Sequence, residues 1–276
     1  MPKKNLSSSG QTGPLSVGNV VSASLRIYRD HFKSYFGLAL VASLWLLVPI
    51  YGWAKYSAIA ALISRLAFGE VRENPETVSD ARREVNPRMW SFFGAGILTS
   101  LIYIGVFLVG TIAMGILAAG AGAIFGQNSP IVAVLLLVVA VIAFLIIYIR
   151  IISRLLIVEL PLAIENNIGA SSAIGRSWEL TKGSVGRIQW IVFVGILVSL
   201  PITFVVQILS QIGESVLKAV LGAESGIFFL VYFILIVLLS FASGALVTPF
   251  WQAMKAIIYY DLRSRKEGLG LQIRDR

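Results

Sequence analysis

The chain lacks cysteine altogether and has a single histidine, His31, among its 276 residues. Without cysteine it can form no disulfide, no thiolate nucleophile and no cysteine-ligated metal site. Charged residues are also scarce: they make up 13% of the sequence, whereas an ordinary soluble domain has roughly a quarter. Apolar residues reach 57% instead. This composition excludes an ordinary soluble fold and predicts an all-α integral membrane protein.

The charge that remains is mostly positive, with 23 Lys and Arg against 14 Asp and Glu and a net charge of +9. The basic residues flank apolar runs and form no separate basic domain, so we expect no binding to nucleic acid. In a chain embedded in lipid, such an excess sets the orientation of the spans instead. The N-terminus contains two lysines without an apolar core directly after them, which predicts a disordered tail over 1–15 rather than a signal peptide.

Long runs without charge locate the membrane spans. They cover 34–54, 89–149, 188–213 and 225–254. About 20 apolar residues cross a bilayer once, and a turn-like sequence at 126–130 divides the second run. These segments therefore predict five spans. The segment 53–69 contains Lys55 and Arg65 but is otherwise apolar, and we interpret it as a sixth.

The distribution of Lys and Arg supports the sixth span. Five basic residues lie in 1–33, five in 65–88, five in 150–187 and five in 263–276. The positive-inside rule places all four groups on the cytoplasmic side only if 53–69 crosses the membrane. The prediction is therefore six transmembrane helices with both termini in the cytoplasm.

Three amphipathic segments precede the pairs of spans. In the first, apolar residues from Val17 to Phe32 share one helical face, while Arg26, Arg29 and Lys33 lie on another. Similar patterns recur at 77–85 and 170–182. They divide a membrane domain at 16–263 into three units of about 16–70, 77–165 and 170–263, each an interfacial helix followed by a transmembrane hairpin. A basic tail follows at 264–276.

Two interpretations of these interfacial helices stay open. Their apolar faces can lie in lipid while basic residues such as Arg26, Arg29 and Lys33 meet anionic headgroups of the cytoplasmic leaflet; alternatively, the helices only orient each hairpin. Thr77 has the spacing of a capping residue for the second helix, and Ser171 is a candidate N-cap for the third. Acidic residues balance the basic ones around the second helix, so a membrane-protein partner is expected there rather than lipid.

Sequence motifs near the fifth span and the C-terminus resemble a known family. ELPLAIENN, AIGRSWELTKGSVGRI and AIIYYDLRSRKEGLGL are similar to the bacterial glycerophosphoryl diester phosphodiesterase membrane-domain family, whose members mostly occur without a catalytic domain. The opening GNVVSASLRIYRDHFKSYFG is also similar to the start of that family. The resemblance implies a six-helix membrane domain with no catalytic assignment. The matching residues are Pro161, Glu165, Arg176, Ser177, Trp178, Leu180, Lys182, Gly183, Tyr259, Tyr260, Asp261, Arg263, Arg265, Lys266, Glu267 and Gly268.

The residue inventory argues against several membrane enzymes. A glycerophosphodiesterase is expected to need paired histidines and a carboxylate-bound metal, but His31 is the only histidine and is better interpreted as an interfacial residue. Ser243 has no histidine in a partner span to act as its base. Asp261 has no second intramembrane aspartate with which to form a dyad. We therefore predict no catalytic residue, no cofactor and no metal site.

Four charges near the ends of spans keep a transporter open as an alternative: Arg150, Arg154, Glu159 and Lys255. A charge at mid-bilayer costs about 2.5 to 3.5 kcal/mol on insertion scales, so each should have a partner or lie near the surface. Arg154 and Glu159 are badly spaced to pair on one helix. We predict that Glu179 pairs with Arg154 and that Lys255 pairs with Glu159, in a structural cluster.

The sequence thus predicts a non-enzymatic scaffold, assembly or lipid-organising protein of a bacterial cell membrane. Its expected partners are anionic membrane lipids and other membrane proteins. A small-solute or ion transporter is the alternative, and a membrane enzyme comes third.

Overall fold

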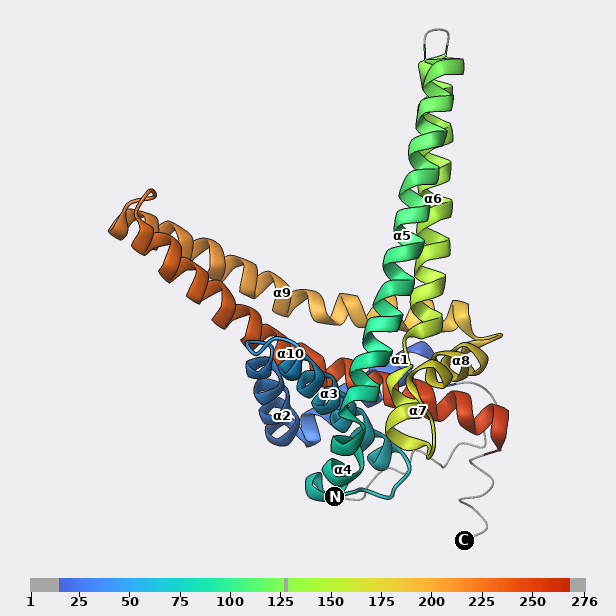
Figure 1. The fold of residues 1–276 in the computed structure, drawn as a ribbon, viewed down its shortest axis with the longest axis vertical. Helices are drawn as coiled ribbons and strands as arrows, with labels where there is room; N and C mark the ends of the chain where they lie inside the picture. Colours follow the sequence, from blue (N-terminus) through green and yellow to red (C-terminus); the bar gives the residue numbers. More distant parts are fainter. Residues whose placement is uncertain (1–14, 127–128, 269–276) are drawn as a thin grey trace.

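The computed structural model describes residues 15–126 and 129–268, and every regular element within these ranges is a helix. Long helices form two extended hairpins, and the shorter helices gather where these hairpins meet (Figure 1). In chain order the elements are α1 (Val17–Asp30), α2 (Phe32–Trp45), α3 (Tyr51–Val71), α4 (Val78–Val85), the 3₁₀ turn η1 (Asn86–Arg88), α5 (Met89–Phe125), α6 (Pro130–Leu155), α7 (Glu159–Ile164), α8 (Ala170–Thr181), α9 (Val185–Leu221) and α10 (Gly226–Glu267).

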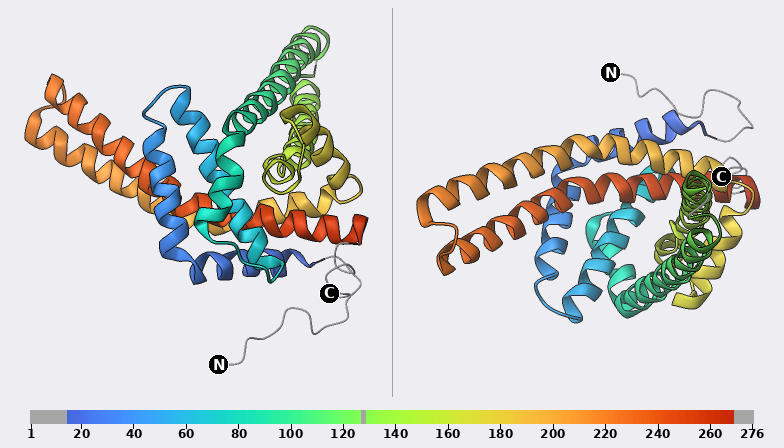
Figure 2. Two further views of the ribbon diagram at one scale, coloured as in Figure 1. Left: turned by 60° about the horizontal axis from the view of Figure 1, so that its bottom comes forward. Right: turned by 90° about the horizontal axis from the view of Figure 1, so that it is seen from above.

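The two long hairpins, α5–α6 and α9–α10, extend from the rest of the molecule and diverge from each other (Figures 1 and 2). Helix α5 has 37 residues, which span about 55 Å at 1.5 Å per residue. Four helical segments are long and apolar enough to cross a membrane: Val78–Phe125, Pro130–Ile164, Val185–Leu221 and Gly226–Glu267. At most 11% of their most apolar stretches is buried. This exposure of apolar side chains fits a helical membrane protein.

Helices α5 and α6 approach closely at a glycine. A Cβ atom at Gly110 would lie 1.9 Å from Cε2 of Phe144, so only glycine leaves room for that ring. Small residues permit such close helix packing in lipid, where burial of apolar surface from water is not available as a driving force. The predicted boundary between two spans agrees with the end of α5 at Phe125 and the start of α6 at Pro130; residues 127 and 128, inside the predicted turn at 126–130, lie outside the described ranges.

Helix α3 lies at the centre of the part that we call the helical base, which comprises α1, α3, α4, α7, α8 and the adjoining ends of the long helices. It packs against α2, α4, α5, α7 and α10. Ala54, Ala58, Ala61 and Ala67 of α3 are all buried. Their small side chains allow neighbouring helices to surround α3. The C-terminal part of α10 completes this core, with residues from Ala245 to Leu262 among the buried ones.

The segment predicted as a first continuous span, 34–54, is interrupted by a turn. Helix α2 ends at Trp45 and α3 begins at Tyr51. Pro49 favours this turn because it lacks a backbone N–H, and Gly52 permits it because a Cβ atom there would lie 1.8 Å from the carbonyl oxygen of Trp45. The helix expected at 53–69 is present as part of α3. Neither α2 nor α3 is among the four segments above, so the six-span arrangement stays a prediction.

The basic tail predicted at 264–276 begins as helix rather than as tail. Helix α10 continues to Glu267 and ends at Gly268, whose φ of 65° is readily adopted only by glycine. Arg263 supports this last turn because its Nε donates to Glu267 at 2.8 Å, one turn further on. Residues 1–14 and 269–276, which hold most of the two predicted tails, lie outside the described ranges.

Candidate functional site

Many of the family-motif residues meet in one polar network of the helical base. Glu165, just after α7, accepts hydrogen bonds from Arg176 Nε of α8 at 3.1 Å and from the Tyr259 hydroxyl of α10 at 2.5 Å. Tyr259 itself is completely buried. One carboxylate therefore joins the consecutive helices α7 and α8 to α10, which lies far from both in the sequence.

A second carboxylate, Glu267, extends the same network. Arg176 and Arg263 both donate to it, and Arg263 Nη1 also donates to the Tyr259 hydroxyl at 3.3 Å. Burial by itself lowers the pKa of Arg176, but its hydrogen bonds to Glu165 and Glu267 raise that pKa overall. The guanidinium is thus held charged between two carboxylates. We call Glu165, Arg176, Tyr259, Arg263 and Glu267 the base network.

Asp261 makes a separate connection. It pairs with Arg187 of α9 and accepts a hydrogen bond from the backbone N–H of Leu15 at 3.0 Å. Arg187 Nη1 in turn donates to the carbonyl oxygen of Leu15 at 3.3 Å. Arg265 lies 3.7 Å from the same carboxylate. These contacts attach the segment before α1 to α9 and α10.

The predicted pair of Glu159 and Lys255 is confirmed, with a distance of 3.3 Å between Oε1 and Nζ. Ser64 of α3, which is fully buried, donates to the same Glu159 oxygen at 2.8 Å. Its hydroxyl also lies 3.1 Å from Gln252 Oε1. This cluster therefore joins α3, α7 and α10, elements that the sequence places far apart.

The predicted pair of Arg154 and Glu179 is wrong. The Arg154 guanidinium lies over the Trp178 ring, 4.2 Å from its centroid, and Ser177 Oγ donates to the Arg154 carbonyl oxygen at 2.7 Å. Helix α8 thus presents Trp178 to Arg154, which gives a cation–π contact in place of an ion pair. Arg150, one turn earlier in α6, is exposed.

Sequence reasoning missed two arginines that hold the end of α7. Arg65 donates to both carboxylate oxygens of Glu76, at 2.7 and 3.0 Å, and to the carbonyl oxygen of Ala163 at 2.7 Å. Arg88 Nη1 donates to the carbonyl oxygens of Leu162 at 2.6 Å and Glu165 at 2.8 Å. Carbonyl groups at a helix C-terminus lack intrahelical partners, so both arginines satisfy α7. In the sequence, the charges of Arg65 and Arg88 indicate only the orientation of the membrane spans and not these contacts.

The remaining motif residues have ordinary structural positions. Pro161 and Leu180 are buried in α7 and α8, and Tyr260 is half-buried. Lys182 and Gly183 are exposed between α8 and α9, where Gly183 has a φ of 83°. Lys266 donates to the carbonyl oxygen of Glu179, so the ends of α8 and α10 are also connected.

The three amphipathic helices turn part of their apolar sides toward the protein. Val20 and Val21 of α1 and Ala81 and Val85 of α4 are buried. In α8 the buried residues are Ala173, Ser177, Leu180 and Thr181. Leu25 and Phe32 of the first predicted apolar face and Trp178 of the third stay exposed, as do the basic residues Arg29 and Lys33, while Arg26 is partly exposed.

Two N-terminal caps and the single histidine can now be placed. Thr77 Oγ1 accepts from the backbone N–H of Asp80 at 3.2 Å, so the predicted cap of α4 is confirmed. The predicted cap at Ser171 is wrong, because α8 begins at Ala170 and its N-cap is Gly169.

His31 separates α1 from α2 and lies 3.2 Å from Glu70 of α3. It therefore helps to position these two helices on α3.

In the described parts of the chain, no three His, Cys, Asp or Glu side chains are grouped so that they could hold a metal ion. The fold and this polar base define a helical membrane protein whose interior charges connect helices. A scan against protein-family models gives no match, and searches of curated proteins and of solved structures give none either.

Proposed function

We propose that this protein is a non-enzymatic membrane scaffold, in which the helical base holds membrane-embedded hairpins that bind lipids or other membrane proteins. One observation carries the proposal: charged pairs in the base join helices distant in sequence, while the long hairpins expose their apolar sides. Asp261 with Arg187 and Glu159 with Lys255 are pairs of residues 74 and 96 positions apart. Glu165 pairs with Arg176 of the next helix and is joined to α10 through the Tyr259 hydroxyl. The carboxylates of these pairs accept further hydrogen bonds from neighbouring groups, and this arrangement supports a role in holding the helices of the base together.

The proposal includes six transmembrane helices with both termini in the cytoplasm of a bacterial cell, as the distribution of Lys and Arg predicts. The base, apart from the part of α3 that crosses the membrane, would then lie at the cytoplasmic surface. Helix α2 has 14 residues, or about 21 Å of helix, which is less than the ~30 Å of a bilayer core. The hairpin α2–α3 would therefore require a locally thinner bilayer.

Single cysteines in the cysteine-free chain test this orientation. The variants are Arg29→Cys and Arg265→Cys in the base, Glu224→Cys between α9 and α10, and Val48→Cys at the end of the hairpin α2–α3. All four positions are exposed. A membrane-impermeant maleimide on intact cells should label positions 224 and 48 only. Labelling of position 29 or 265 would overturn the orientation, and protection of position 48 with labelling of 224 would limit the protein to four spans.

Anionic lipids are the proposed partners of the polar side of α1 and of Lys33 at the start of α2. Its basic residues are available there, whereas Val20 and Val21 on its apolar side are buried where α1 packs on α9 and α10. Each basic residue near an anionic surface contributes ~1 kcal/mol. The binding of anionic lipids is supported by the exposed positions of Arg29 and Lys33. Membership of the glycerophosphoryl diester phosphodiesterase membrane-domain family is likewise proposed, on the sequence motifs alone.

Purification in mild detergent tests the scaffold itself. Mass spectrometry of the purified sample should find a defined protein partner, or retained lipids in a fixed ratio to the protein. Another multi-span protein, purified from the same membranes in the same detergent, is the control for non-specific lipid carry-over. A lipid-free monomer without partners would contradict the proposal.

A transporter is the second candidate, because the pair of Glu159 and Lys255 is an interior charge pair near the membrane helices. The substitution Glu159→Gln distinguishes the two functions. A scaffold predicts lower thermal stability and no effect on flux, because Lys255 and Ser64 lose their charged partner. Unchanged stability together with altered ion or solute flux in proteoliposomes would favour transport.

A further inference from the structure

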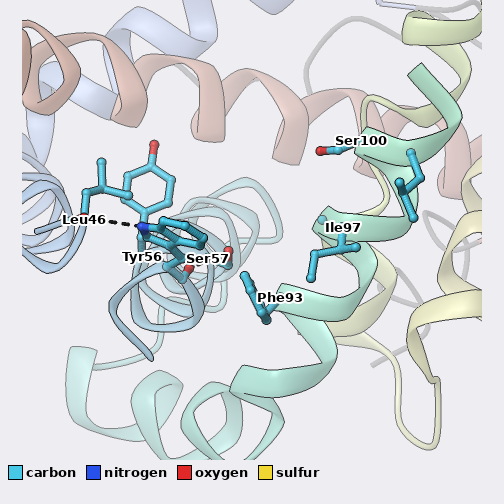
Figure 3. Close-up of a pocket in the computed structure, with 9 residues that line it drawn as sticks. Leu46, Tyr56, Ser57, Phe93, Ile97 and Ser100 are labelled. Carbon is cyan, nitrogen blue, oxygen red and sulfur yellow. Dashed lines mark hydrogen bonds between the residues drawn. The ribbon is translucent and has the colours of Figure 1, made fainter. Parts of the chain in front are cut away.

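A hollow of about 330 Å³ separates the first part of α3 from the first half of α5. Leu46, Trp53 and Tyr56 line it on one side, and Phe93, Ile97 and Leu101 on the other. Figure 3 shows Ile97 and Ser100 on α5 facing the space beside Tyr56 and Ser57. The hollow therefore lies between the hairpin α2–α3 and the hairpin α5–α6.

The hollow opens on an apolar surface. Leu46, Trp53, Ile97 and Leu101 line it and are also exposed, with 38% to 58% of each residue accessible. On α5 this surface continues into a segment that is long and apolar enough to cross a membrane. In the membrane, the medium that meets this hollow is therefore the hydrocarbon of lipids.

Two of the four polar side chains that line the hollow are hydrogen-bonded within the protein. The Trp53 indole N–H donates to the carbonyl oxygen of Leu46 at 3.3 Å, and Ser57 Oγ donates to the carbonyl oxygen of Trp53 at 2.9 Å. An occupant therefore need not supply hydrogen bonds to these groups. Apart from the hydroxyls of Tyr56 and Ser100, the rest of the lining is apolar, which favours an apolar occupant.

The size of the hollow favours a chain-like occupant over a helix. Pockets for small molecules have volumes of about 300 to 1,000 Å³, and this one is at the lower end of that range. A transmembrane helix from a second copy has a diameter of about 10 to 12 Å with its side chains, so it would cover the opening without filling the hollow. A flexible hydrocarbon chain can enter it.

We propose that this hollow binds one acyl chain of a membrane phospholipid, which holds the hairpins α2–α3 and α5–α6 at a fixed separation. The inference rests on the proposed membrane insertion of both hairpins. It assigns a lipid-binding role to Trp53, Phe93, Ile97 and Leu101 that is distinct from headgroup binding by the basic residues of α1.

Gly96 provides the test, because it lines the hollow and a Cβ atom there meets no atom within 4 Å. Gly96→Leu should fill the space without moving the backbone. Gly105→Leu is the matched control: a Cβ at Gly105 also meets no atom within 4 Å, and nine residues further along α5 it lies on the opposite side of the helix. Ser100→Leu is a second variant that fills the hollow.

The measurement is quenching of tryptophan fluorescence in detergent by phosphatidylcholine with brominated acyl chains. The contribution of Trp53 is the difference between the protein and its Trp53→Phe variant. We expect saturable quenching of Trp53, at least a tenfold weaker apparent affinity in Gly96→Leu and Ser100→Leu, and no change in Gly105→Leu. Saturable quenching that survives both hollow-filling variants, or quenching that never saturates, would overturn the proposal.

Two further readouts separate this inference from its premises. Quenching of the other tryptophans in vesicles of the same lipid reports membrane insertion, so failure there would count against the proposed function rather than against the hollow alone. Sedimentation in detergent reports self-association. A dimer that Gly96→Leu dissociates would show that a second copy occupies the hollow, and it would overturn the lipid assignment.

Discussion

Helices α3 and α5 show opposite relations between apolar character and burial. Helix α3 contains Lys55 and Arg65, yet most of its residues are buried. Helix α5 is far more apolar, yet only Met89, Phe92 and Ala95 of its 37 residues are buried. Apolar residues exposed to lipid cost nothing, so apolar character does not mark the interior of a membrane protein. Here small side chains and paired charges mark it instead.

The largest effect should come from truncating a large side chain in α3. Leu62 is 2% exposed, so Leu62→Ala leaves a cavity and should lower the free energy of unfolding by about 2 to 5 kcal/mol. Leu108 of α5 is 52% exposed, and Leu108→Ala should have no measurable effect. Equilibrium unfolding in mixed detergent micelles measures both. An equal loss of unfolding free energy in the two variants would show that Leu108 of α5 is buried in the native protein, and it would contradict the contrast between α3 and α5.

The base network should give the next largest effect. Glu165→Gln removes the charge that faces Arg176 and leaves only a neutral amide oxygen to accept from Tyr259, and hydrogen bonds of charged groups contribute about 1.5 to 3 kcal/mol. The exposed Glu179 is the matched control, because Glu179→Gln removes an equal charge from α8 outside the network. Thermal unfolding in detergent compares the two. A control that loses as much stability would mean that net charge, not the network, stabilises the base.

Enlarging an alanine also tests the contrast between the buried α3 and the exposed α5. Ala61 of α3 has no exposed surface, so Ala61→Leu should overpack the base and cost about 1 to 3 kcal/mol. Ala119 of α5 is exposed, and Ala119→Leu has lipid on that side and should be tolerated. The fraction of protein that remains monodisperse after heating is a suitable measure. A harmless Ala61→Leu would indicate unfilled space beside α3.

The smallest effect concerns the edge of the base. Thr77→Ala removes the N-cap of α4 and should cost about 1 kcal/mol, seen as faster backbone amide exchange in α4. Ser171→Ala, at an exposed position just inside α8, should leave exchange in α8 unchanged because Gly169 is the N-cap there. If exchange in α8 rises instead, the hydroxyl of Ser171 has a capping role in solution.

The sequence predicted features that depend on neighbours along the chain. The boundary between two spans at 126–130, the helix at 53–69, the cap at Thr77 and the amphipathic helices all follow from local spacing. The pair of Glu159 and Lys255 was also predicted, because an interior carboxylate and an interior lysine each need an opposite charge. The partner of Arg154 was not, since the choice between Glu179 and the neighbouring Trp178 depends on how α8 is rotated against α6.

The break after Trp45 shows where local patterns fail. A charge-free run of adequate length looks like one span, but Pro49 and Gly52 form a turn whose consequence, a 14-residue α2, follows only from the folded hairpin. The hollow beside Gly96 could not be predicted either. It exists because α3 and α5 separate beyond their contact in the base, and a glycine alone does not indicate what lies opposite.

By itself, the sequence determined a helical, lipid-embedded class of protein, because 57% apolar and 13% charged residues cannot form a soluble surface. It also located the helices, since their periodicity and end signals are local. Only the tertiary structure decided which helix is central and which charges meet. The physical reason is that the helices long enough to cross the membrane are all apolar, so hydrophobicity does not determine which of them pack together. That choice depends on shape and on hydrogen bonds between side chains such as Glu165 and Tyr259, nearly a hundred residues apart.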